Sequence, residues 1–196
     1  MAYHSIEEIL QYCRAHGKKF YEGVLIPLFR SGQAEHGQIV KSLYVSAGIG
    51  QVIAARAFIA GASGGCQAEI GAASSMTAGA LTALKGGSND QIAHAAAMAL
   101  KTLLGLVCDP VAGLVEVPCV KRNVIGAVNA MTSADMALAG ITSAIPADQV
   151  FDAMREVGEK MHPSLKETGG RGAGRRQGRR TDCQVSDKIE KIYVLF

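Results

Sequence analysis

The sequence predicts an all-α protein, a compact bundle of closely packed helices rich in alanine and glycine. Hydrophobic residues make up 48% of the 196 residues, but aromatic residues make up only 5% and tryptophan is absent. Sheets favour β-branched and aromatic residues, so this composition indicates helices joined by glycine-rich turns. Capping signals recur along the chain, and its length suffices to bury one core.

The first predicted helix covers residues 5–16. It begins with Ser5, has Glu8 three positions later, and is followed by Gly17. Serine followed by glutamate at this spacing forms a capping box, and glycine is a common helix stop. The segment therefore reads as a short amphipathic helix.

The central region is expected to form helices separated by a glycine-rich turn. Residues 36–60 are apolar on most faces, which predicts one buried helix or two helices broken near Gly48 and Gly50. A glycine-rich turn is expected over 61–65, and a helical pattern then resumes over 66–84.

Three more helices are expected in the second half. Residues 88–90 supply N-cap residues for the next helix. The segment 107–119 contains two prolines and a glycine, and because Pro110 disfavours helical geometry before it, this segment reads as a loop. Two further helices follow, over 121–140 and 146–161.

The charge distribution divides the chain into a helical domain and a tail. Seven of the 20 Lys and Arg residues, with three acids, lie in 168–196, so the formal charge of +3 becomes −1 for the remainder. We expect one domain over 1–168 and a disordered, Arg-rich tail over 169–196. Nothing in the domain indicates a nucleic-acid partner.

The pattern of apolar residues argues against export and against a membrane. The chain does not open with a secretory signal pattern, so we expect a cytoplasmic protein. The longest stretch without Asp, Glu, Lys or Arg, 70–84, is 15 residues long, whereas a membrane helix needs about 20 apolar residues.

Three of the five cysteines share an unusual context. Cys66, Cys108 and Cys119 each occur within two residues of glycine or proline, in GGC, CDP and VPC. Their intervals of 42 and 11 residues do not match the short C-x-x-C hooks of zinc ribbons or thioredoxin-like sites. A folded scaffold would have to bring such widely spaced residues together.

The residues alone leave three interpretations of these cysteines open. They could be inert core residues, since free cysteine is often buried. They could be three ligands of a zinc site. They could also hold three corners of a [4Fe–4S] cluster and leave the fourth iron open to substrate.

Several motifs carry a specific family resemblance. They are GASGGCQAEIGAASSM, LLGLVCDPVAGLVEVPCVKRNVIGAVNA, ADMALAG and IPADQVFDAMREVG. Together they resemble the α chain of the bacterial iron–sulfur L-serine dehydratase, also called L-serine ammonia-lyase. The likeness runs from about residue 40 to residue 168, and the opening segment is also similar.

The resemblance implies both a cofactor and a reaction. It implies that Cys66, Cys108 and Cys119 ligate a [4Fe–4S] cluster on their loops, and that L-serine is converted to pyruvate and ammonia without pyridoxal phosphate. It also implies a β chain as partner, an oligomeric enzyme and a role in amino-acid degradation.

Two departures from the family pattern concern the active site. The family's long segment after its opening helix is missing, and residues 24–40 join the flanking parts directly. The end of the chain is also altered, being rich in arginine. We therefore expect the β chain to supply the missing serine- and histidine-bearing portion, without which activity is doubtful.

Other candidate residues have plainer alternatives. Glu69 could tune the cluster or bind the substrate amine, or it could form a structural ion pair. Lys121, Arg122 and Asn123 could offset the cluster's negative charge or hold a substrate carboxylate, or they could form a solvated turn. His94 reads as a packed histidine, and no general base is assigned.

The remaining two cysteines are not expected to be ligands. Cys13 reads as a small residue on its helix. Cys183 lies in the altered tail and reads as a free thiol, although some family members place a C-terminal cysteine on the open iron.

Overall fold

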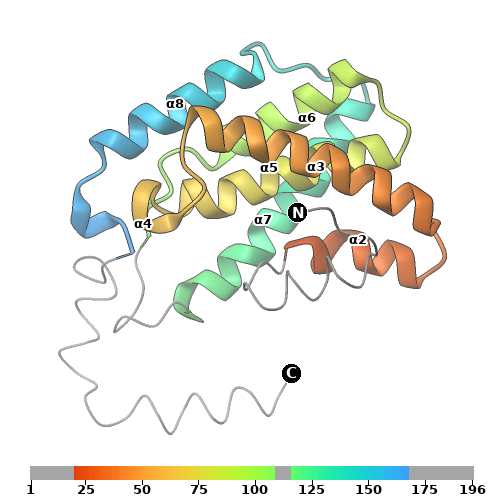
Figure 1. Ribbon diagram of the computed structural model, residues 1–196, viewed down its shortest axis with the longest axis horizontal. Helices are drawn as coiled ribbons and strands as arrows, with labels where there is room; N and C mark the ends of the chain where they lie inside the picture. The colour runs from red at the N-terminus through yellow and green to blue at the C-terminus, as the bar shows by residue number, and fades with distance from the viewer. Residues whose placement is uncertain (1–19, 109–115, 168–196) are drawn as a thin grey trace, which may run out of the picture.

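A computed structural model describes residues 20–108 and 116–167, and all regular elements in these ranges are helical (Figure 1). The predicted all-α bundle is therefore confirmed. The helices are α2 (Phe20–Arg30), α3 (His36–Arg56), α4 (Gly61–Gly64), α5 (Ala72–Leu84), α6 (Asn89–Thr102), α7 (Glu116–Leu138) and α8 (Ala147–Lys160). A π-helix covers Gln67–Gly71, and a 3₁₀ helix covers Pro163–Leu165.

Helix α5 runs through the middle of the bundle, with α3, α6 and α7 packed around it (Figure 1). Its buried face consists almost entirely of Ala, Gly, Ser and Thr. Two buried hydroxyls bond to carbonyls of neighbouring helices: Ser74 donates to Gly126 (2.8 Å) and Ser75 to Ala96 (2.9 Å). Small side chains thus allow neighbouring helices to approach α5 closely, and the hydroxyls of Ser74 and Ser75 still have hydrogen-bond partners.

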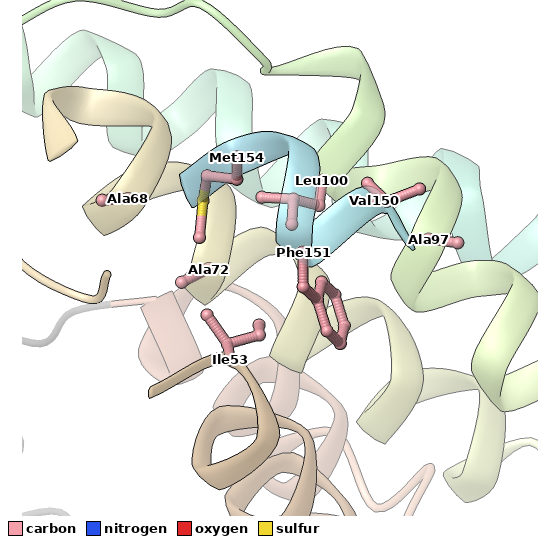
Figure 2. Close-up of a cluster of buried hydrophobic side chains, with 8 residues drawn as sticks. All are labelled: Ile53, Ala68, Ala72, Ala97, Leu100, Val150, Phe151 and Met154. Atoms are coloured by element: carbon pink, nitrogen blue, oxygen red, sulfur yellow. The ribbon is translucent and has the colours of Figure 1, made fainter. Parts of the chain in front are cut away.

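The largest apolar cluster lies where α8 closes over α3, α5 and α6. Figure 2 shows its side chains, which include the fully buried Ile53, Leu100 and Met154 together with Phe151. Arg56 and Asp152 tie α3 to α8 at the edge of this cluster through a 2.6 Å ion pair. The cluster fixes α8, whose C-terminal end leads back toward the cysteines.

Some helix boundaries differ from those predicted. Region 36–60 contains the single helix α3, one of the two predicted alternatives, but the helix is not buried all round. Its buried residues are four, Ile39, Ser42, Ser46 and Ile53, because only one face packs against the bundle. The expected turn over 61–65 contains the short helix α4. Helix α2 had not been predicted.

Helix α7 begins earlier than expected. The last four residues of the loop predicted over 107–119 belong to α7, so that Cys119 lies in the first turn of this helix. Pro118 is tolerated there because the first amides of a helix have no intrahelical partner.

Other expectations concern residues that the structure does not describe. The predicted helix over 5–16 and the tail over 169–196 lie outside the described residues, so the division into 1–168 and 169–196 stays a prediction. Among the described helices, none is long and apolar enough to cross a lipid bilayer.

Candidate metal centre

Three cysteines from separate segments meet at one end of the bundle. The Sγ atoms of Cys66, Cys108 and Cys119 all lie within 4.8 Å of one another. Cys66 precedes the π-helix, Cys108 follows α6, and Cys119 belongs to α7. Cys66 and Cys108 are buried, with 0% and 2% exposure, and Cys119 is partly exposed. The fold therefore brings together the three cysteines that the sequence analysis singled out.

The backbone before Cys66 depends on Gly65. Its φ of 76° and ψ of −175° fall in a region that is essentially restricted to glycine. An added Cβ would also lie 2.7 Å from Met161 Sδ and 3.1 Å from the Leu106 carbonyl oxygen. Gly65 thus allows α4, the Cys108 loop and the end of α8 to meet beside the thiol.

Gln67 is a supporting residue that the sequence analysis missed. Its side chain is fully buried, donates from Nε2 to the Met154 carbonyl (3.2 Å) and accepts from the Gly105 amide (2.8 Å). Its own amide donates to the Leu106 carbonyl (2.8 Å). Gln67 therefore fastens the Cys66 segment to α8 and to the loop before Cys108.

The other two cysteines are held through their backbones. The Cys108 amide donates to the Leu165 carbonyl (2.8 Å), which anchors the loop to the 3₁₀ helix. In α7, Asn123 Nδ2 donates to the Cys119 carbonyl (3.0 Å). These bonds leave all three sulfurs available to a shared ligand.

The surroundings favour neutral thiols in the metal-free protein. Apolar residues pack around the cysteines, including Ile70, Leu103 and Leu106. Burial raises the pKa of Cys66, and the neighbouring Cys108 adds to that rise. Burial likewise raises the pKa of Cys119, with further contributions from Cys108 and Glu69. Metal binding would therefore have to displace protons from this site.

Arg122 is a basic residue in contact with the cysteine site. Its Nη1 donates to Cys66 Sγ (3.5 Å) and to the Val107 carbonyl (3.0 Å). This guanidinium opposes the rise in the pKa of both Cys66 and Cys119. Of the predicted Lys-Arg-Asn group, Lys121 is exposed, while Arg122 and Asn123 are half-buried.

The remaining candidates lie in different settings. Glu69 is an exposed member of the π-helix, close enough to Cys119 for its charge to raise the pKa of that thiol. His94 accepts a hydrogen bond from the Ser143 amide at Nδ1 (3.3 Å) and so links α6 to the segment before α8, as a packed histidine does. Cys13 and Cys183 lie outside the described residues.

Comparison with known proteins identifies the family to which the chain belongs. Residues 22–173 match the family described as serine dehydratase alpha chain, a region that contains all three cysteines. The chain belongs to the serine dehydratase α-chain family. Within this family it is 54% identical over 147 residues to a probable L-serine dehydratase, alpha chain, of Latilactobacillus sakei, which covers 75% of this chain and 70% of that one.

Two other relatives are much longer than the shared region. A probable L-serine dehydratase, alpha chain, of Bacillus subtilis is 58% identical over 132 residues, covering 67% of this chain and 44% of that one. An L-serine dehydratase, alpha chain, of Peptoniphilus asaccharolyticus is 53% identical over 131 residues, covering 67% and 45%. The chain thus spans less than half the length of these two relatives.

Proposed function

We propose that the chain is the cluster-binding part of an iron–sulfur L-serine ammonia-lyase, which converts L-serine to pyruvate and ammonia. The observation that carries the proposal is the convergence of three thiols within 4.8 Å. Family membership supports it, because the relatives are named L-serine dehydratase.

Three thiolates are the donor type of a [4Fe–4S] cluster with one open corner, and the sulfurs would move apart from their present spacing of at most 4.8 Å to reach three corners of a cubane. Thiolates are the usual cluster ligands, and three of them leave one iron without a protein sulfur. The apolar residues around Cys66 and Cys108 limit the access of water to the cluster. When bound, the cluster supplies a Lewis-acidic iron for removal of the serine hydroxyl.

The chain's own residues would act as holders of this group. Cys66, Cys108 and Cys119 each ligate one iron. Gln67 and Gly65 maintain the backbone that presents Cys66. Because Cys119 is partly exposed, one side of the centre faces outward, and we assign this side to substrate and to the β chain.

Anaerobic reconstitution with iron and sulfide tests the proposal. We expect a brown protein with about four irons and four sulfides per chain and broad absorption near roughly 400 nm. A folded protein that stays colourless after loading would contradict a cluster.

A structural zinc site is the second candidate, favoured by the short distances between the sulfurs. Tetrahedral zinc with Zn–S bonds of about 2.3 Å places its sulfurs about 3.8 Å apart, which is compatible with the 4.8 Å limit. This function predicts about one zinc per chain and no acid-labile sulfide. Metal analysis of protein loaded with iron and sulfide, in competition with zinc, separates the two functions.

A further inference from the structure

We propose that Arg122 is a positioning residue for the cluster, which donates an N–H···S hydrogen bond to the Cys66 sulfur and thereby retains the cluster and sets its reduction potential. This inference rests on the proposed function. It assigns to one side chain a role that neither the family match nor the relatives' names describe.

The geometry connects Arg122 to all three ligand segments. Arg122 lies in α7, three residues after Cys119. Its Nη1 donates to Cys66 Sγ at 3.5 Å. The same nitrogen donates at 3.0 Å to the carbonyl of Val107, the residue before Cys108. A single guanidinium therefore joins the segments that carry Cys66, Cys108 and Cys119.

The chemistry of the guanidinium suits a sulfur that carries negative charge. Arginine stays protonated at any pH that the protein encounters, and its bonds to anionic acceptors are stronger than bonds between neutral groups. Arg122 is half-buried, so solvent screens this interaction less than it would at the surface. Hydrogen bonds to cluster sulfurs are one of the means by which proteins set cluster potentials.

The direction of the effect follows from charge. Reduction adds an electron to the cluster and makes its sulfurs more negative, so a cationic donor stabilises the reduced form more than the oxidised form. Loss of Arg122 should therefore lower the potential. It should also speed ligand loss at Cys66, because the Cys66 sulfur would no longer accept a hydrogen bond from the Arg122 guanidinium.

The test uses the full chain reconstituted with iron and sulfide, in four versions: wild type, Arg122→Gln, Arg122→Lys and Lys121→Gln. Lys121→Gln is the matched control, since it removes one positive charge from an exposed neighbour in the same helix. Two quantities are measured anaerobically: the rate of iron release to a chelator, and the midpoint potential of the cluster. Circular dichroism checks that each variant is folded.

We expect Arg122→Gln to release iron about 10-fold faster, the typical lower range for loss of a group that supports a metal ligand, and to have a lower potential. Arg122→Lys keeps the charge but loses the fork geometry, so its values should lie between those of Arg122→Gln and wild type. Lys121→Gln should match wild type. If Arg122→Gln does not fold, the comparison of Arg122→Lys with Lys121→Gln decides the question.

Three outcomes would overturn the inference. A folded Arg122→Gln protein with the wild-type rate of iron release and the wild-type midpoint potential would show that Arg122 has no role toward the cluster. This conclusion would hold even if the variant needed a higher concentration of L-serine for activity. Faster release with an unchanged potential would reduce Arg122 to a structural link between α7 and the Cys108 loop. A wild-type protein that takes up no cluster would overturn the proposed function, and this inference with it.

Discussion

Cys119 differs from Cys66 and Cys108 in being partly exposed, yet a shared cluster would make all three equally necessary. Each of the three ligated corners of the cluster would have one protein ligand, so loss of any sulfur would open a second iron to solvent. Exposure therefore does not rank the three residues by importance. It indicates only the side from which the centre is reached.

We expect Cys66→Ser, Cys108→Ser and Cys119→Ser each to lose most of the bound iron and sulfide. A hydroxyl is a poor replacement for thiolate at iron. Iron and sulfide per folded chain are the measurement, which remains valid if the chain is inactive. Cys13→Ser and Cys183→Ser serve as controls and should retain the cluster. A dispensable member of the trio, or a control as harmful as the trio, would disprove the ligand assignment.

At the level of single residues, the three cysteines and Arg122 were predicted as site candidates, but the contacts of Arg122 and the role of Gln67 were not. A glycine or proline within two residues marked each of Cys66, Cys108 and Cys119, because glycine and proline shape the local backbone. Gln67 and Arg122 act through contacts with residues 15 to 87 positions away in the chain. Such contacts leave no periodic pattern around the residue itself.

At the level of elements, the short link between α4 and the π-helix determines how Cys66 is presented. Gly65→Ala should destabilise the protein by about 1–3 kcal/mol from backbone strain, and further through its contacts with Met161 and Leu106. It should also lower cluster retention. Urea unfolding and iron content are the measurements.

Gly86→Ala is the matched control for this strain. Gly86 also has a positive φ, of 80°, but an added Cβ would meet nothing within 4 Å. Its substitution should cost less stability and leave the iron content unchanged. Equal losses in the two variants would show that contacts around Gly65 contribute nothing.

Helix α8 is held chiefly by its apolar face. Met154 is fully buried in the main cluster, so Met154→Ala should lower the free energy of unfolding by about 2–5 kcal/mol. Met154→Leu preserves volume and should cost less than about 1.5 kcal/mol. Urea denaturation at fixed metal content measures both. A loss below 1 kcal/mol for the alanine variant would contradict the packing described for α8.

Capping and turn residues in the sequence predicted most of the helices, but they did not predict the π-helix or the prolines within helices. Ser88 begins α6 and accepts from the Gln91 amide (3.2 Å), as its N-cap position predicted. The π-helix after Cys66 had no such signal, because its wider turn depends on packing against α8 and the Cys108 loop. Pro27 lies inside α2, where a proline disfavours helix, whereas Pro118 lies in the first turn of α7, where its missing amide removes no intrahelical bond.

At the level of the whole molecule, the centre lies at one end of the bundle and is partly open through Cys119. A reaction at this side needs further groups to bind L-serine and to remove its α-proton. We expect the reconstituted chain alone to form little pyruvate, and addition of the β chain to raise the rate at least 10-fold. A coupled assay for pyruvate measures this. A rate that does not change when the β chain is added would disprove the need for it.

The wide spacing of the three cysteines has a consequence for the unfolded chain. A centre that ties Cys66, Cys108 and Cys119 together closes one loop of 42 residues and another of 11. Such closure removes conformational freedom that the metal-free chain would regain on unfolding, and the cost grows only slowly with loop length. Bound metal therefore acts as a branched crosslink. Melting temperature should fall when a chelator removes it, and the protein should then unfold over a lower range of urea concentration.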